Sequence, residues 1–284
     1  MPELPEVEVV RRDLDAVLRA RTLVHVEVGR DRAVRRAASI DAFVDAVQGR
    51  AVREARRVGK FLVVDLDAVD ARVPSEALVI HLGMSGQLRM ASSNAEPRAP
   101  HTHVVFSLDD GREIRFVDPR TFGQMFVSPV DDSARPDALA HLGPDALLEL
   151  GTPDDVAPIL AGRRVAVKTR LMDQRAVAGL GNIYSDEILF RAGVRGTRES
   201  GSITDDEIAR IHRASRNVIH AAVEARGSSL ADAQYVDLYG RPGRFQHQHA
   251  VHARSGKPCR HCGAAVTRQR LGGRFGYWCP RCQS

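Results

Sequence analysis

Four cysteines near the end of the chain constrain its fold more than any other feature. Cys259 and Cys262 form one pair, Cys279 and Cys282 form another, and each pair encloses two residues. Such pairs hold opposite sides of a tetrahedral ion, so the spacing predicts a four-thiolate zinc site. The alternative, two disulfides, requires an oxidising compartment, and the acidic start of the chain lacks the apolar core of a secretory signal. We therefore expect one structural zinc ion and a reducing compartment, with another soft metal as the remaining alternative.

The chain is strongly basic around these cysteines. No acidic residue follows Asp237, whereas nine basic ones do: Arg241, Arg244, Arg254, Lys257, Arg260, Arg268, Arg270, Arg274 and Arg281. A zinc ion with four thiolates carries a charge of about −2, which leaves about seven positive charges in this stretch. The whole chain has a formal net charge of only +5. This concentration predicts a surface that binds a phosphate backbone, with a solvated basic tail as the alternative.

The residues between the two cysteine pairs have the pattern of a β-hairpin. Two short runs, Val266–Leu271 and Phe275–Trp278, have strand composition. The Gly272–Gly273 pair between them can supply the positive φ angles of a tight turn. Arg274 then lies beside the turn, at the tip of the hairpin. It is either a functional side chain on a rigid finger or an ordinary exposed arginine.

The first 130 residues combine one helix with many short strand-like runs. The helix begins near Pro5 and carries one apolar stripe, formed by Val7, Val10, Leu14 and Leu18. The strand-like runs comprise residues 22–28, 60–66, 77–82, 103–108, 113–117 and 124–127. This pattern predicts a two-layer β-sandwich or flattened barrel. With 284 residues the chain can form two domains, and no apolar run approaches the ~20 residues of a membrane span.

The pattern becomes helical after a linker-like stretch at residues 128–133 and stays helical up to Gly227. The clearest helix opens with a capping box, Thr204-Asp-Asp-Glu207. Before it, Gly179-Leu-Gly-Asn182 divides the pattern into two shorter helices. The backbone N–H groups of this glycine-rich turn could hold a phosphate, and a plain interhelical loop is the alternative.

The N-terminus offers a nucleophile if Met1 is removed, because Pro2 then carries a free secondary amine. Such an amine can attack the aldehyde carbon of a sugar, and the resulting iminium favours elimination of a neighbouring phosphate. Glu3 beside it could move protons. A Pro-Glu start is common, however, and alone it more often has no function.

Several side chains elsewhere would suit an enzyme that acts on damaged DNA. Met84 lies in a glycine-flanked loop, and Arg120 and Phe122 lie on the Asp118–Gly123 turn. Apolar wedges and arginines are the groups that fill the gap left when a base is extruded from a duplex. Lys60 precedes a strand, where its charge would face a groove or solvent. Each of these residues alone is more often part of a core or a surface.

Six segments, in order along the chain, closely resemble the bacterial formamidopyrimidine-DNA glycosylase family. They are Met1–Glu8, His81–Gly86, Asp118–Gly123, His141–Pro144, Leu171–Asp173 with Gly179–Tyr184, and the four-cysteine segment. The resemblance implies an α+β fold, in which an N-terminal helix and two-layer β-sandwich precede a helix–two-turns–helix domain that ends in a β-hairpin zinc finger. The implied domains are residues 1–130, 131–249 and 250–284.

The resemblance also implies roles for single residues. Pro2 would be the Schiff-base nucleophile at the deoxyribose C1′, and Glu3 the general acid/base that helps to open the sugar. Lys60 would donate a proton in β-elimination and contact phosphate. Arg274 would serve δ-elimination and bind the phosphates that flank the lesion, and Glu6 would line the lesion pocket.

Other residues match positions that contact DNA in this family. Met84, Arg120 and Phe122 match the set that fills the void, with Arg120 facing the orphaned cytosine. Four more match DNA-contact positions: His101, Arg163, Lys168 and Asn182. Thr121 stands where many members have a second arginine, and Arg163 where a lysine is frequent, and neither departure threatens the activity. Residues 228–248 cover the loop that closes over the excised base.

The implied function is that of a base-excision-repair enzyme, a DNA glycosylase and abasic-site lyase that removes oxidised purines such as 8-oxoguanine and formamidopyrimidines. Its partner would be double-stranded DNA with oxidised bases, and we expect a monomer in the cytoplasm, at the nucleoid, without membrane attachment. One alternative is an endonuclease VIII-like enzyme for oxidised pyrimidines, although Leu4 and the intact void-filling set resemble the purine branch more. The other is a non-catalytic zinc-finger DNA-binding protein.

Overall fold

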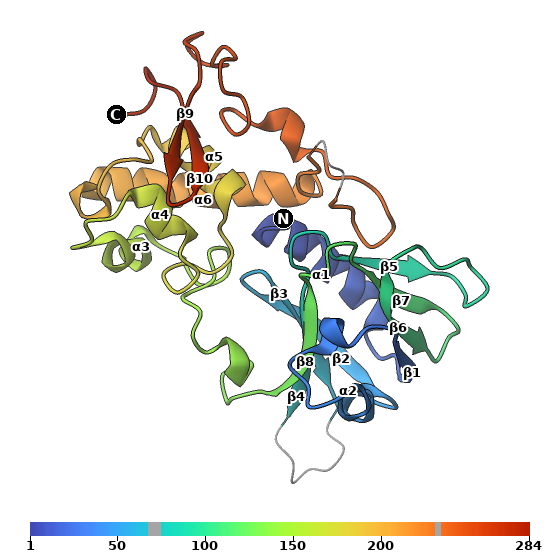
Figure 1. Cartoon of the computed structure of the whole chain (residues 1–284). Coiled ribbons are helices and arrows are strands. Elements are labelled where there is room, and N and C mark those ends of the chain that lie inside the picture. The colour runs from blue at the N-terminus through green and yellow to red at the C-terminus, as the bar shows by residue number, and fades with distance from the viewer. Residues whose placement is uncertain (68–74, 231–233) are drawn as a thin grey trace. The chain divides into compact units, whose positions relative to one another are not determined.

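The chain forms two compact units, which the computed structural model describes over residues 1–67, 75–230 and 234–284 (Figure 1). The first unit comprises Met1–His141 and Arg226–Gly243, and the second comprises Leu142–Ala225 and Arg244–Ser284. Among the described residues, no helix combines the length and the hydrophobicity that crossing a lipid bilayer requires.

The first unit contains two four-stranded antiparallel sheets, which confirms the predicted two-layer β-sandwich. One sheet has the order β1 (Leu23–Val28), β6 (Thr102–Leu108), β7 (Glu113–Val117) and β5 (Gln87–Ala91). The other has the order β2 (Val52–Val58), β3 (Phe61–Leu66), β4 (Glu76–His81) and β8 (Gln124–Pro129). The unit also holds the helices α1 (Leu4–Leu18) and α2 (Ile40–Val47) and the short 3-10 helices η1 (Asp31–Val34) and η2 (Asp137–Leu139).

One apolar core joins both sheets to α1. Strands of both sheets contribute side chains that alternate along each strand, as a half-buried strand requires: Leu62, Val64, Leu78, Ile80, Val104, Phe106, Ile114 and Phe116. The predicted stripe of α1 also lies in this core, with exposed fractions of 1% for Val7 and Val10, 0% for Leu14 and 4% for Leu18. Burial of this stripe fixes the direction in which α1 presents its N-terminus.

The second unit is helical and ends in a hairpin. It contains α3 (Pro153–Leu160), α4 (Val167–Met172), α5 (Asn182–Ala192), η3 (Ser200–Ser202), α6 (Asp205–Glu224), η4 (Phe245–Gln248), β9 (Thr267–Leu271) and β10 (Arg274–Trp278). The predicted capping box opens α6: Glu207 N–H donates to Thr204 Oγ1 at 3.3 Å, and Thr204 N–H donates to Glu207 Oε2 at 3.0 Å. The turn before α5 separates it from α4, as the Gly179–Asn182 segment predicted.

Residues 226–243 return from α6 to the first unit. Leu238 is fully buried in the core of that unit, and its carbonyl accepts a hydrogen bond from Met90 N–H at 3.0 Å. Asp237 is also fully buried, and its Oδ2 binds Arg226 Nε at 2.7 Å and Arg241 Nε at 2.8 Å. Arg226 in turn forms an ion pair with Asp13 of α1. This segment contains most of the predicted lesion loop, of which residues 231–233 lie outside the described part of the chain.

Candidate functional site

The N-terminal residues are buried and held by hydrogen bonds. Pro2 is buried, Glu3 is 2% exposed, and only Met1 before them is exposed. Glu3 caps α1, and Glu6 Oε2 accepts the N–H of Glu3 at 2.9 Å. The other oxygen of Glu6, Oε1, accepts the N–H of Ser228 at 2.7 Å. The carboxylate of Glu6 therefore ties the Pro2–Glu3 peptide to the start of the returning segment.

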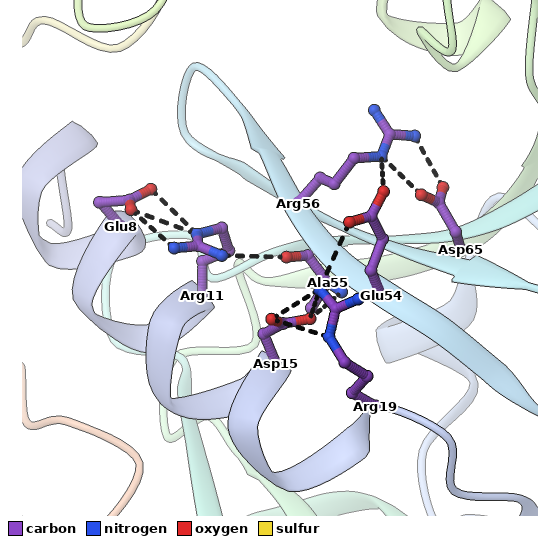
Figure 2. Close-up of polar contacts among 8 residues, drawn as sticks. All are labelled: Glu8, Arg11, Asp15, Arg19, Glu54, Ala55, Arg56 and Asp65. Carbon is purple, nitrogen blue, oxygen red and sulfur yellow. Dashed lines mark hydrogen bonds and ion pairs between the residues drawn. The ribbon is translucent and has the colours of Figure 1, made fainter.

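Side chains of α1 bind the edge of β2 and so hold the helix in place (Figure 2). Ala55 N–H donates to Asp15 Oδ1 at 2.8 Å, and Arg11 Nη1 donates to the carbonyl of Ala55 at 3.3 Å. These are the two backbone groups that a further strand would have paired. Figure 2 also shows Arg56 paired with Asp65 at 2.5 Å.

A buried charge cluster fixes the same helix one turn nearer its start. Glu8 accepts hydrogen bonds from Arg57 Nε at 3.1 Å and from Arg11 Nη2 at 3.0 Å, and the side chain of Arg57 is fully buried. Burial raises the pKa of Glu8, but the hydrogen bond from Arg11 and the charges of Arg57 and Arg11 outweigh it, so the net pKa is lowered. Glu8 therefore stays ionised and keeps both arginines in position.

Lys60 occupies the two-residue turn between β2 and β3 and is only 7% exposed. The sequence left two alternatives for this side chain, a groove or solvent, and its burial excludes the second one. Its charge lies near His81, whose ring stacks on Phe61 at 4.6 Å. Burial first, and then the charges of Lys60 and Arg35, lower the pKa of His81 to about 4. His81 is therefore neutral at pH 7, and its Nδ1 accepts Gly83 N–H at 3.3 Å.

The loops that carry Met84, Arg120 and Phe122 pack directly against each other. A Cβ on Gly83 would lie 2.5 Å from the backbone nitrogen of Gly123, so only glycine permits this approach. Met84 is 37% exposed and Phe122 is 43% exposed, although both are large and apolar. The guanidinium of Arg120 lies 4.9 Å from the centre of the Phe122 ring. The structure thus brings the three predicted void-filling residues together on one exposed platform.

A fully buried carboxylate organises this platform. Asp118 Oδ1 accepts Ser85 Oγ–H at 2.5 Å, and Asp118 Oδ2 accepts Gly123 N–H at 2.7 Å. From outside the turn, Arg35 Nη1 donates to the carbonyl of Gly123 at 2.7 Å, and Arg32 Nε donates to that of Thr121 at 3.1 Å. The sequence singled out the Asp118–Gly123 turn but gave no role to these supporting side chains, because their partners lie far away in the chain.

Two polar residues on this side of the sandwich have left-handed backbones. His101 has φ 65° and Thr121 has φ 55°, which is unfavourable for a β-branched residue. The carbonyl of His101 accepts Asp118 N–H at 3.0 Å. The exposed side chain of His101 therefore belongs to a residue that is bonded directly to the platform's Asp118. Backbone strain of this kind accumulates where a fixed geometry is required.

The turn between α4 and α5 is rigid because Gln174 spans it. Gln174 Nε2 donates to the carbonyl of Leu180 at 2.7 Å, and its Oε1 accepts Gly179 N–H at 3.0 Å. Asn182, the first residue of α5, has a buried Oδ1 for which the described residues provide no hydrogen-bond partner. Arg163 before α4 is exposed.

Lys168 differs from the other predicted DNA contacts because its side chain is 2% exposed. Its Nζ lies 2.6 Å from Asp186 Oδ1 and 3.1 Å from the carbonyl oxygen of Phe275. A contact with an external ligand would require this ammonium group to leave both partners.

The four cysteine sulfurs gather at the base of the β9–β10 hairpin, all within 4.8 Å of one another. Cys259 Sγ lies 3.9 Å from Cys282 Sγ, and Cys262 Sγ lies 3.4 Å from Cys279 Sγ. Tetrahedral zinc with Zn–S bonds of ~2.3 Å places its sulfurs about 3.8 Å apart, so the arrangement fits that ion. At the other end of the hairpin, Gly272 and Gly273 have φ 53° and 82°, and Arg274 is exposed beside them. The predicted finger is confirmed.

Three family models match the chain in sequence. They are the formamidopyrimidine-DNA glycosylase N-terminal domain over residues 1–125, the H2TH domain of the same glycosylase over residues 142–234, and a zinc finger found in FPG and IleRS over residues 256–284. The chain belongs to the formamidopyrimidine-DNA glycosylase family. Its fold class and its single structural zinc ion follow the family, as the sequence predicted.

Individual members of the formamidopyrimidine-DNA glycosylase family match along the whole chain. The formamidopyrimidine-DNA glycosylase of Nocardia farcinica is 41% identical over 290 residues, covering 100% of this chain and 98% of the relative. That of Geobacillus kaustophilus is 40% identical and covers 100% of both chains. The crystal structure of MutM (Fpg) from Thermus thermophilus has a TM-score of 0.84 at 40% identity, covering 99% of this chain and 98% of that one. A point mutant of Lactococcus lactis Fpg, solved in complex with DNA containing Fapy-dG, has a TM-score of 0.87 at 27% identity over 100% of both chains.

Proposed function

We propose that this chain is a base-excision-repair enzyme, a bifunctional DNA glycosylase and abasic-site lyase that removes oxidised purines from duplex DNA. The observation that carries the proposal is the family match along the whole chain, together with the buried Pro2–Glu3 start held by Glu6. Solved Lactococcus lactis relatives contain DNA with Fapy-dG or an abasic site. The basic, zinc-stapled finger of this chain suits the same kind of ligand.

In the proposed first stage, Pro2 acts as the nucleophile once Met1 has been removed. Its secondary amine attacks C1′ of the damaged nucleotide, and the N-glycosidic bond breaks with its electron pair and a proton going to the departing base. Glu3 protonates the ring oxygen as the C1′–O4′ bond opens, and the amine loses its proton. The product is an iminium that joins Pro2 to C1′.

In the proposed second stage, the iminium drives two eliminations. In β-elimination a base takes a C2′ proton, the C3′–O bond breaks, and the 3′-phosphate leaves with the electron pair of that bond and a proton from Lys60. In δ-elimination a base takes the C4′ proton and the C5′–O bond breaks, with Arg274 stabilising the departing 5′-phosphate. The burial of Lys60 beside neutral His81 holds its ammonium group in a defined position, which suits a proton donor. The exposed guanidinium at the hairpin tip is suited to flanking phosphates.

Residues from several parts of the chain would bend DNA and hold it open. The platform of Met84, Arg120 and Phe122 would fill the gap left by the extruded base, with Arg120 facing the orphaned cytosine. His101, Arg163 and Asn182 would contact the DNA backbone, and the buried Lys168 would act from inside the protein. Glu6 and residues 228–248 would surround the base. We assign these tasks to domains 1–130, 131–249 and 250–284 of a monomer that works at the nucleoid.

The test is borohydride trapping on a duplex with one 8-oxoguanine opposite cytosine. Chain that begins at Pro2 should form a covalent adduct, whereas Pro2→Gly should lose most of it and Arg274→Ala should keep it but bind DNA less tightly. Duplexes with adenine opposite the lesion, or with an oxidised pyrimidine, would show which lesion class is preferred. Absence of an adduct with Pro2 verified as the first residue would overturn the proposal.

A further inference from the structure

The outer edge of β10 is not paired with another strand of the described chain. β10 has one strand neighbour there, β9, so the backbone groups on its other edge need different partners. Two side chains provide them: Lys168 Nζ donates to the carbonyl of Phe275 at 3.1 Å, and Asp186 Oδ1 accepts Tyr277 N–H at 3.1 Å. A carbonyl and an N–H two residues apart are the groups that a neighbouring strand would have paired.

Lys168 and Asp186 also bind each other. Lys168 Nζ lies 2.6 Å from Asp186 Oδ1, and both side chains are 2% exposed. The second oxygen of Asp186, Oδ2, lies 2.8 Å from His252 Nδ1. The carboxylate thus joins α5, which carries Asp186, to α4, to β10 and to the segment before the finger.

Two glycines provide the space that the side chain of Lys168 occupies beside β10. Gly276 lies between the two bonded residues of β10, and a Cβ there would lie 3.3 Å from Lys168 Cδ and 3.0 Å from Leu271 Cδ1. A side chain at this position would push the lysine away from the strand. On the other side, a Cβ on Gly196 would lie 3.2 Å from Lys168 Cβ. Two glycines therefore flank the lysine where it crosses to the hairpin.

A buried ion pair contributes little to stability on balance, because desolvation of the two charges opposes their attraction. Such a pair does, however, hold its two side chains in one arrangement, because separating them leaves an uncompensated charge inside the protein. Here the pair fixes residues 275 and 277, and Arg274 is the next residue toward the hairpin tip. Any movement of β10 along α4 or α5 would break the hydrogen bonds of Phe275 to Lys168 and of Tyr277 to Asp186.

We propose that the Lys168–Asp186 pair acts in place of a third strand and positions the finger hairpin, and with it Arg274, on the α4–α5 module. Asp186 is a positioning residue in this scheme, and Lys168 acts from inside the protein. The inference rests on the proposed function, because it assigns the pair to the δ-elimination step of Arg274. A lysine that contacts DNA phosphate directly is the competing interpretation of Lys168.

The experiment compares Asp186→Asn with the unchanged chain on a duplex carrying 8-oxoguanine. Asparagine keeps the size of the side chain and an acceptor for Tyr277 N–H, but it leaves Lys168 without a counter-charge. We expect Pro2 trapping within about twofold of the unchanged chain, and a ratio of δ- to β-elimination product lowered about tenfold, as for other small misplacements of a reacting group. Hydrogen exchange of the Tyr277 amide should become faster.

A double-mutant cycle distinguishes positioning from general destabilisation. If Asp186 acts through Arg274, adding Asp186→Asn to Arg274→Ala should change the product ratio no further. Glu207→Gln is the matched control, because it removes the ion pair with Arg198 and weakens the α6 cap without contacting the hairpin. Glu207→Gln should lower the melting temperature about as much as Asp186→Asn does, but it should leave the ratio of δ- to β-elimination product unchanged.

Three results would overturn the proposal: an unchanged product ratio in Asp186→Asn, an effect that adds to that of Arg274→Ala, or an equal effect of Glu207→Gln. If Asp186→Asn does not fold, Gly276→Ala carries the same test, and it should shift the ratio and the Tyr277 exchange in the same direction but less. Weaker DNA binding by Lys168→Met with an unchanged Tyr277 exchange rate would show a direct phosphate contact instead. Failure of the unchanged chain to form any adduct would refute the proposed function. The hydrogen exchange of the Tyr277 amide would still test whether the Lys168–Asp186 pair positions β10.

Discussion

Replacing Glu6 with glutamine tests whether one carboxylate holds the proposed nucleophile in place. Glu6 is 1% exposed, and its two oxygens serve two separate backbone donors, Glu3 N–H at 2.9 Å and Ser228 N–H at 2.7 Å. Glutamine has one acceptor oxygen, so it can satisfy only one of them. Its amide nitrogen would face the other donor at hydrogen-bond distance, where two donors repel each other.

The size of the effect follows from these contacts. A hydrogen bond to a charged acceptor contributes about 1.5–3 kcal/mol, and a buried donor left without a partner costs about 1–3 kcal/mol. Glu6→Gln should therefore destabilise the first unit by about 3 kcal/mol. For a unit of this size, each kcal/mol corresponds to about 2–4 °C, so its melting temperature should fall by about 6–12 °C. Looser anchoring of the Pro2–Glu3 peptide should slow base excision about ten- to hundredfold.

The assay is single-turnover excision of 8-oxoguanine at a temperature where both proteins are folded, together with a thermal melt. Asp15→Ala is the control, because it removes the acceptor of Ala55 N–H from the same helix at a place away from Pro2. It should lower the melting temperature while excision stays within about threefold of the unchanged chain. Glu6→Gln with unchanged excision and a melting temperature within about 2 °C would refute the reasoning.

Three further predictions concern the metal and two charged groups. Cys279→Ser, or zinc chelation, should release about one zinc ion per chain and abolish DNA binding while the β-sheet circular dichroism persists, because the finger core is too small to fold without metal; retained DNA binding after complete zinc loss would contradict this. Arg226→Ala should cost about 2–3 kcal/mol near pH 7, because the buried carboxylate of Asp237 and that of Asp13 lose a shared counter-charge. Arg226 lowers the pKa of both carboxyls, so its loss raises the already elevated pKa of Asp13 further and raises the lowered pKa of Asp237 as well. Both carboxyls then bind protons at a higher pH in the folded variant, so this cost should shrink as the pH falls toward 4, and a cost independent of pH would contradict it. His81, whose pKa is lowered to about 4 by burial, binds a proton first in the unfolded chain. Stability should therefore fall by up to about 3 kcal/mol between pH 6.5 and 4, and His81→Asn should flatten this part of a urea-unfolding profile.

Features encoded by neighbouring residues could be predicted from the sequence. The apolar stripe of α1, the Thr204–Glu207 capping box and the Gly272–Gly273 hairpin each depend on local spacing, and each has the expected bounds to within a few residues. β2 was missed because Arg53, Glu54, Arg56 and Arg57 interrupt any apolar alternation. These charges are tolerated because partners from distant segments, such as Glu8 and Asp65, neutralise them.

The same limit applies to the candidate site. The sequence identified Met84, Arg120 and Phe122, but it could not show that Asp118 and two glycines bring their loops together. The family resemblance also placed Lys168 among the DNA-contact positions, and the sequence does not show that its side chain is only 2% exposed. The buried position of that lysine depends on Asp186, and no spacing rule relates the two residues.

The α1 side chains at the edge of β2 have a consequence for the behaviour of the protein in solution. An unprotected edge strand can recruit a strand from another molecule and so start aggregation. Asp15 and Arg11 occupy the N–H and carbonyl of Ala55, so this edge cannot act as a template while α1 is docked. A variant that releases α1 should therefore precipitate at high concentration, in addition to losing the placement of Pro2 and Glu3. The helix that positions the N-terminus thus also shields the edge of β2.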